Sequence, residues 1–177
     1  MPEASELSKI RFVEVKIPAL FCKNNVEVID TPGTNDLTTG RVEITYDYLK
    51  KADAVILLLS AEQALSKSEK EFISEWVTCN PTKDFFIVIS HKDYLEGPKQ
   101  ENEVKQYVLF HLSDLGDFSK RVFVVSSRQA LLYRRKEAGE LLPPRVLRDL
   151  PNTIEETGFP KFERELLRFI SSKRSGR

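Results

Sequence analysis

The chain has 177 residues, of which 41% are hydrophobic and 31% charged, a balance typical of a protein that can bury a core. Lysine plus arginine equals aspartate plus glutamate at 27 each, so the basic excess of a protein that binds nucleic-acid phosphates is missing and we expect no nucleic-acid partner. The longest apolar run, Ala54 to Leu59, is too short to span a bilayer.

The cysteines and the first residues bear on the location of the protein. Cys22 and Cys79 are far apart in sequence and match no metal-binding spacing, which fits a reducing cytoplasm better than a disulfide framework. The first residues have neither the basic region nor the apolar region of a signal peptide. We therefore expect a cytoplasmic protein.

The first fifty residues predict a strand pair, a loop and a short helix. Apolar and charged residues alternate over Ile10–Ile17, and a second strand pattern covers Val26–Asp30 after a turn at Lys23–Asn25. The two strands are expected to pair in antiparallel fashion. The polar stretch Thr31–Gly40 predicts a loop, and Glu43–Lys51 predicts a short helix.

From residue 53 onward, strand and helix patterns alternate, which favours a parallel sheet covered by helices. The predicted strands are the apolar runs 53–60, 84–90 and 121–126, each with both faces covered. The predicted helices are 101–112, 128–138, 162–171 and one that starts at the capping box Ser66–Glu69. Residues 141–157 contain three prolines and predict an irregular insert. In such sheets, ligands bind at the carboxyl ends of the strands.

The helix patterns also predict which side chains are buried. Apolar residues recur at the spacing of one helix face in three of the predicted helical segments. The expected inward positions are Phe72, Ile73, Trp76 and Val77, then Val104, Tyr107, Val108 and Leu112, then Phe162, Leu166, Phe169 and Ile170.

The first strand end with residues that could bind a ligand is Asp30–Gly33, Asp-Thr-Pro-Gly. The carboxylate of Asp30 can hold a magnesium ion through water, because magnesium keeps part of its hydration shell. Gly33 lets a backbone N–H approach a terminal phosphate closely. An ordinary strand-to-loop turn uses the same residue types, so both interpretations stay open.

The second strand end is Ser90-His91-Lys92-Asp93. An aspartate there can accept two hydrogen bonds from guanine, one from the ring N–H and one from the exocyclic amine. Adenine lacks that pair of donors, so one carboxylate can select the base. The alternative is that Asp93 caps the next helix.

The third strand end is Ser126-Ser127-Arg128. Backbone amides in a loop at this position can contact the oxygen of a base. The alternative is again a helix cap, here for the helix that follows directly.

Together the three strand ends resemble the GTPase superfamily, with its Asp-x-x-Gly, Asn/Thr-Lys-x-Asp and Ser-Ala-Lys motifs. Longer stretches resemble bacterial members of the dynamin family, and the resemblance covers roughly residues 10 to 135. The matching stretches are Val28–Asp36, Glu43–Tyr46, Ala52–Leu65 and Val125–Leu131.

The resemblance implies a P-loop-NTPase-like three-layer α/β/α fold, with a mostly parallel sheet and an antiparallel edge hairpin. It implies that Asp30 supports Mg²⁺ through water, that the amide of Gly33 senses the γ-phosphate and that Asp93 recognises guanine. Ser126 and Ser127 would line the base pocket, and residues 34–41 would be the moving switch segment. The implied nucleotide-binding set is Asp30, Thr31, Gly33, Ser90, His91, Asp93, Ser126 and Ser127, and no catalytic residue is named.

The resemblance also implies ligands and partners. GTP or GDP with Mg²⁺ would bind, and two chains could pair, as a homodimer or a heterodimer, through the nucleotide face. In the intact family GTP hydrolysis drives membrane remodelling. Any membrane contact here would be indirect, so that the protein is at most peripheral to a membrane.

Two features of the sequence depart from the family pattern. The phosphate-binding motif Gly-x-x-x-x-Gly-Lys-Ser/Thr does not occur in the 177 residues, so the fold is expected to lack the first strand and the phosphate loop. Ser90 stands where Asn or Thr is usual, and His91 stands where Lys is usual. We therefore expect a single incomplete domain over residues 1–177, with disordered ends at 1–9 and 172–177, from a truncated reading frame or a split gene.

Three functions remain open from the sequence. The first is a GTP-binding fragment of a dynamin-family protein that is weakly active or inactive by itself. The second is a non-catalytic interaction module that pairs with an intact GTPase paralogue or with a split N-terminal half. The third is an unrelated α/β binding domain whose strand-end aspartates are helix caps.

Overall fold

The computed structural model describes residues 26–31, 49, 51–80 and 84–175. The chain divides into two compact units, residues 1–31 and residues 32–177. The helices and strands below belong to the second unit. The prediction of one incomplete domain over residues 1–177 stays a prediction.

A parallel sheet forms the centre of the second unit. Its strands are β1 (Ala54–Ser60), β2 (Asp84–Ser90) and β3 (Val122–Val124), in the order β1-β2-β3. Each pair is parallel, with Leu59 opposite Ile89 and Ile89 opposite Val124. The predicted α/β fold with a parallel sheet is confirmed, although β3 is shorter than the predicted strand 121–126.

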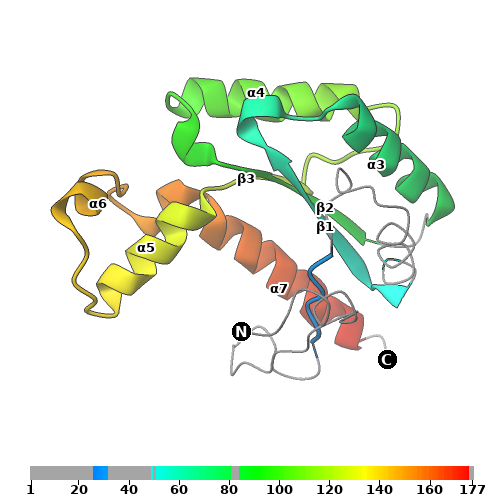
Figure 1. Ribbon diagram of the computed structural model, residues 1–177. Helices are drawn as coiled ribbons and strands as arrows, with labels where there is room; N and C mark the ends of the chain where they lie inside the picture. Colours follow the sequence, from blue (N-terminus) through cyan, green and yellow to red (C-terminus); the bar gives the residue numbers. More distant parts are fainter. Residues whose placement is uncertain (1–25, 32–48, 50, 81–83, 176–177) are drawn as a thin grey trace, which may run out of the picture. The chain divides into compact units, whose positions relative to one another are not determined.

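Two helices cover one face of this sheet, as Figure 1 shows. They are α3 (Lys67–Cys79) and α4 (Pro98–His111), and Ile73 of α3 and Val108 of α4 are both fully buried. The predicted inward position of Tyr107 is wrong, because its side chain is 49% exposed. The buried stripe of α4 is narrow and centred on Val108, so Tyr107 turns outward and contacts the ring of His111 instead.

The amino end of α3 has the predicted capping box. The backbone N–H of Glu69 donates to the hydroxyl of Ser66 at 3.3 Å, and the N–H of Ser66 donates to the carboxylate of Glu69 at 2.6 Å. Two N–H groups that the helix itself cannot satisfy thus gain partners.

Replacing Ser66 with alanine is expected to lower the free energy of unfolding by about 1 kcal/mol, because one of these N–H groups loses its acceptor. Urea unfolding followed by circular dichroism measures the loss. Ser74→Ala is the matched control, since Ser74 lies in the middle of the same helix, away from its amino end. Equal losses in the two variants would contradict the capping role.

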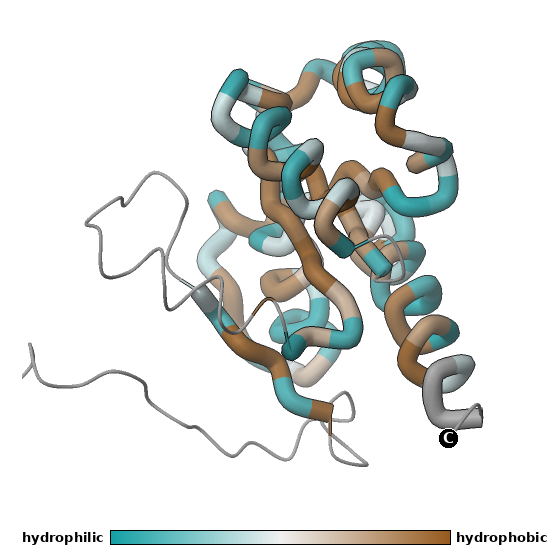
Figure 2. Tube along the Cα trace, turned by 90° about the vertical axis from the view of Figure 1, so that its right-hand side faces the viewer, coloured by the Kyte–Doolittle hydropathy of each residue, from teal (hydrophilic) through white to brown (hydrophobic). Residues whose placement is uncertain are grey.

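The other face of the sheet carries α7 (Phe159–Ser175). Aromatic side chains join the two layers, with ring centroids 5.6 Å apart for Phe86 and Phe169 and 5.5 Å apart for Phe123 and Phe162. Figure 2 shows the hydrophobic stretches along the strands that these helices cover. The three-layer arrangement is therefore that of the predicted α/β/α fold.

The strand β1 differs from the prediction on the α7 side of the sheet. Ile56 and Leu58 are 40% and 65% exposed, so this face of β1 is not covered as its continuous apolar run predicts. The reason is the position of α7, whose aromatic contacts go to β2 and β3.

Several boundaries after β3 also differ from the prediction. Helix α5 spans Ser127–Glu137, close to its predicted range. The insert predicted as irregular contains α6 (Pro144–Arg148) and the 3-10 helix η4 (Ile154–Thr157), since proline is well tolerated in the first turn of a helix. Helix α7 starts three residues before its predicted start and continues through residues 172–175, which were expected to be disordered.

The amino-terminal predictions are only partly covered by the described residues. Residues 26–31 are neither helix nor strand, so the strand predicted at Val26–Asp30 is wrong; a strand requires hydrogen bonds to a neighbour, which an alternating pattern cannot guarantee. Its expected partner, residues 10–17, lies outside the described residues. Leu49 and Lys51, at the end of the predicted helix 43–51, are helical.

Candidate functional site

Strands β1 and β2 each end in a serine, and a hydrogen bond joins the two strands at this point. Ser60 and Ser90 lie opposite each other in the parallel register. The hydroxyl of Ser90 donates a hydrogen bond to the carbonyl of Leu59 at 2.8 Å, which bridges the two strands where they end. Ser90 therefore fixes the start of the loop that follows β2.

His91 is the first residue of that loop and has an unusual backbone. Its φ of 61° lies in the left-handed region, which residues with a Cβ rarely adopt. Its ring stacks on Tyr94 with centroids 5.1 Å apart, and its Nδ1 lies 3.4 Å from the hydroxyl of Ser60. The side chain is exposed at this edge of the sheet, beside the next loop residues.

Asp93 lies in the 3-10 helix η3 (Lys92–Tyr94) that follows, and its side chain is 7% exposed. Its Oδ2 is 3.5 Å from Nη1 of Arg128, which belongs to the third strand-end motif. The backbones meet as well, because the N–H of Lys92 donates to the carbonyl of Val125 at 3.1 Å. The structure therefore brings the second and third motifs together.

The alternative of a helix cap is wrong for Asp93 and correct for Ser126. The N-cap of α4 is Gly97, and no side-chain cap is present there. Ser126 is fully buried, and its hydroxyl accepts a hydrogen bond from the N–H of Gln129 at 3.1 Å, which caps α5. The side chain of Ser126 is therefore turned inward, whereas Ser127 is exposed at the first position of α5.

The first motif belongs to the other unit or lies outside the described residues. Asp30 is exposed and Thr31 half-buried in the unit of residues 1–31. Gly33 and the predicted switch segment 34–41 lie outside the described residues. Within the described part of the chain, no three His, Cys, Asp or Glu residues cluster as metal ligands would. The described residues thus provide a carboxylate that suits a base, but not an assembled magnesium site.

A corner at Thr157 and Gly158 supports the third motif, and the sequence did not reveal it. The N–H of Ser126 donates to the carbonyl of Thr157 at 2.9 Å. Gly158 has a φ of 73°, and a Cβ there would lie 2.1 Å from the carbonyl oxygen of Val124. A glycine after a predicted insert could have suggested a turn, but nothing in the sequence shows this close approach.

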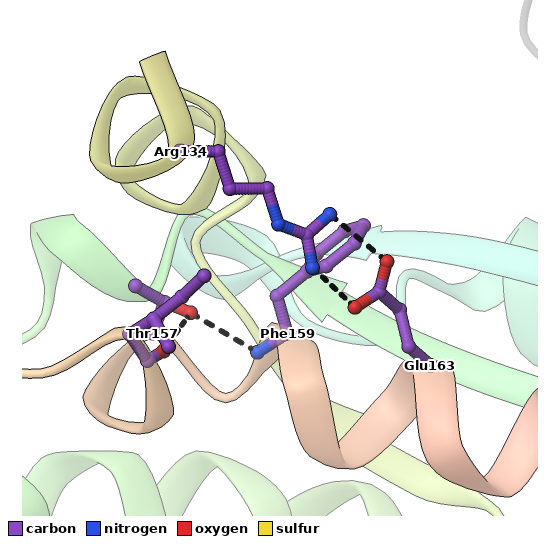
Figure 3. A network of polar contacts seen from close by, with 5 residues as sticks. Arg134, Thr157, Phe159 and Glu163 are labelled. Atoms are coloured by element: carbon purple, nitrogen blue, oxygen red, sulfur yellow. Dashed lines mark hydrogen bonds and ion pairs between the residues drawn. The ribbon is translucent and has the colours of Figure 1, made fainter. Parts of the chain in front are cut away.

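Further polar contacts hold this corner and join α5 to α7, as Figure 3 shows. The hydroxyl of Thr157 donates to the carbonyl of Ile154 at 2.6 Å and accepts from the N–H of Phe159 at 3.3 Å. Arg134 of α5 forms a bidentate ion pair with Glu163 of α7, with 2.9 Å between Nη1 and Oε1. Hydrogen bonding to Glu163 raises the pKa of the Arg134 guanidinium.

A shallow hollow of about 240 Å³ lies beside the loop of Asp93. Its polar wall includes Lys92 and Glu101, whose charged atoms are 2.6 Å apart. The remaining lining residues are Leu95, Gly97, Pro98, Pro151 and Glu156. The loop after β2 and the segment before α7 therefore border one hollow.

The fold is an α/β fold of the P-loop-NTPase kind, with its loops of interest at the carboxyl edge of a parallel sheet. The model of the dynamin family matches residues 3–93, about half of the chain. The chain belongs to the dynamin family.

Named relatives agree with this assignment. "Dynamin-like protein 1" of Campylobacter jejuni is 30% identical over 111 residues, which are 61% of this chain and 15% of that protein. "Bacterial dynamin-like protein" of Nostoc punctiforme is 25% identical over 182 residues, 94% of this chain and 24% of that protein. An uncharacterized protein of Caldicellulosiruptor is 26% identical over 166 residues, 92% of this chain and 37% of that protein. The chain thus spans between about one seventh and two fifths of these relatives.

Proposed function

We propose that this chain contains the guanine-recognising part of a GTP-binding domain, with GTP and GDP as ligands and Mg²⁺ as the accompanying ion. One observation carries the proposal: the carboxylate of Asp93, 7% exposed, lies against Arg128 of the loop that follows β3. Both belong to segments predicted from the sequence to contact one base. The family membership of the chain supports the same ligand.

The chemistry of Asp93 suits guanine. A carboxylate accepts hydrogen bonds and donates none, so its two oxygens match the ring N1–H and the exocyclic amine of guanine. Adenine presents an acceptor at N1 and has no amine at C2. Low exposure excludes competing water, which makes the hydrogen bonds of a charged acceptor more selective.

The other predicted residues have supporting roles in the proposal. The N–H groups of Ser127 and Arg128 precede the first hydrogen bond within α5 and are available to the oxygen of the base. Ser90 and His91 hold the loop before Asp93 through their contacts with β1. Asp30 would support Mg²⁺ through water, with Thr31 and Gly33 beside the phosphates.

The activity of the intact protein is part of the proposal. We expect the full protein to hydrolyse GTP in the cytoplasm and to act on membranes through regions other than this chain. None of the helices among the described residues is long and apolar enough to cross a bilayer. Pairing of two chains through the nucleotide face, as a homodimer or with a paralogue, stays a prediction.

Asp93→Ala is expected to remove the preference for guanine. In the wild-type chain with Mg²⁺, fluorescently labelled GTP should bind more tightly than labelled ATP, because only guanine offers two donors to the carboxylate. In the variant the two affinities should converge, with GTP weakened by at least about tenfold, the value of one hydrogen bond to a charged group. Fluorescence anisotropy measures both affinities.

Asp114→Ala is the control, because this exposed aspartate lies in the turn after α4, away from the loops that follow β2 and β3. It should leave the ratio of GTP to ATP affinity unchanged. Equal binding of GTP and ATP by the wild-type chain, unaffected by Asp93→Ala, would favour an unrelated α/β domain over the proposal.

A further inference from the structure

Residues 149–158, between α6 and α7, are hydrogen-bonded to the loop that follows β3 and to α5. This segment is called the strap. Three of its carbonyl groups accept hydrogen bonds from the loop after β3 and from α5. The N–H of Ser126 donates to Thr157 at 2.9 Å, the Gln129 amide donates to Asp149 at 2.7 Å, and the Tyr133 hydroxyl donates to Asn152 at 3.3 Å. The strap is therefore fastened along one side of the loop and helix.

The end of the strap at Thr157 is the most constrained of these contacts. Thr157 is fully buried, and its hydroxyl joins Ile154 before it to Phe159 after it. These two hydrogen bonds hold the turn that directs the carbonyl of Thr157 at Ser126. Gly158 then packs directly on the carbonyl of Val124, so the turn cannot shift toward the sheet.

The strap also borders the loop of Asp93. Pro151 and Glu156 line the hollow of about 240 Å³ together with Leu95 and Pro98. One segment that was expected to be an irregular insert thus contacts the loop after β3 and borders the hollow beside the loop of Asp93.

The contact with Ser126 has a direct consequence for the residues proposed to meet the base. Ser126 is the N-cap of α5, so its position sets the position of the first turn of that helix. Ser127 and Arg128 form that turn, and Arg128 lies 3.5 Å from Asp93. A change in the direction of the Thr157 carbonyl would therefore move the amides that face the base.

We infer that Thr157 is a positioning residue for guanine recognition, acting through the backbone of Ser126. The inference rests on the proposed function, since it concerns the geometry of that same site. The hydroxyl of Thr157 holds the turn, the turn aims the carbonyl, and the carbonyl fixes the N-cap of α5. The strap thereby influences the selectivity for guanine without touching the ligand.

The test uses the full chain with two substitutions at this position. Thr157→Val keeps the shape and removes both hydrogen bonds of the hydroxyl, whereas Thr157→Ser keeps the hydroxyl. Thr153→Val is the matched control, because Thr153 is an exposed residue of the same strap whose hydroxyl contacts Glu156. Val108→Ala, on the buried face of α4, controls for a general loss of stability.

The first measurement is amide hydrogen exchange of Ser126, taken relative to that of Ile87, whose N–H donates to Arg121 in the sheet. We expect Thr157→Val to raise this ratio by about tenfold, since the acceptor of the Ser126 N–H is no longer held in place. Thr157→Ser should restore it, and Thr153→Val and Val108→Ala should leave it unchanged.

The second measurement is the ratio of GMP to AMP affinity, obtained by NMR titration. Both nucleotides carry the same phosphate group, so its contribution cancels in the ratio. Thr157→Val should reduce the preference for GMP at least about threefold, and Thr157→Ser should retain it. A Thr157→Val variant that matches Val108→Ala in both measurements would overturn the inference. Absence of any GMP preference in the wild-type chain would instead overturn the proposed function, while the exchange ratio would still decide whether Thr157 positions the loop.

Discussion

Gly158→Ala is expected to lower the free energy of unfolding by about 3 kcal/mol or more, the largest loss we expect from a single substitution. Two costs add up at this position. A φ of 73° costs a residue with a Cβ about 1–2 kcal/mol, and forcing a methyl group into a packed site costs about 1–3 kcal/mol. The new Cβ would lie 2.1 Å from a backbone oxygen of β3, which cannot move without displacing the strand.

Gly139→Ala separates these two costs. Gly139 has a similar φ of 84°, but an added Cβ would meet nothing within 4 Å. This variant should lose only the backbone contribution of about 1–2 kcal/mol. Urea unfolding of both variants measures the difference, and equal losses would show that the approach of Gly158 to Val124 does not constrain the fold.

The fold could be predicted from the sequence where a local pattern coincided with the tertiary contacts. The apolar run of β2 is buried in a parallel sheet as predicted, and the capping box at Ser66 needs only residues three positions apart. The pattern at Val26–Asp30 was equally clear but carries no strand, because strand formation depends on a neighbour that local sequence does not specify. Ile56 and Leu58 were expected to be buried, and their exposure depends on which strands α7 covers.

The candidate site could be predicted only at the level of strand ends. Parallel strands bring their carboxyl ends to one edge, which is why Asp93 and the loop after β3 were expected together. The ion pair of Asp93 with Arg128 was not foreseen, since Arg128 was considered only as part of a loop. Thr157 and Gly158 were missed because their roles come from contacts with residues about thirty positions earlier in the chain.

Asp93→Asn is expected to exchange the preferred base from guanine to xanthine. Xanthine keeps the ring N1–H of guanine but has a carbonyl in place of the C2 amine. The asparagine oxygen can accept from N1–H while its NH₂ group donates to that carbonyl, whereas the wild-type carboxylate would face it with a second acceptor. GMP affinity should fall by about tenfold and XMP affinity should rise by a similar factor, as expected for one hydrogen bond lost and one gained at a charged or buried acceptor. Isothermal titration with GMP, XMP and AMP measures the three affinities.

The exchange of preference distinguishes direct contact from a structural role for Asp93. The ion pair with Arg128 is the alternative source of an effect, because asparagine would leave that guanidinium without its carboxylate. Loss of the ion pair can loosen the loop and weaken every nucleotide, but it cannot improve the binding of XMP. Asp117→Asn, the same chemical change on an exposed loop that precedes β3, should leave all three affinities unchanged. A uniform loss for GMP, XMP and AMP in Asp93→Asn would assign Asp93 to the support of the loop and leave base recognition to other groups.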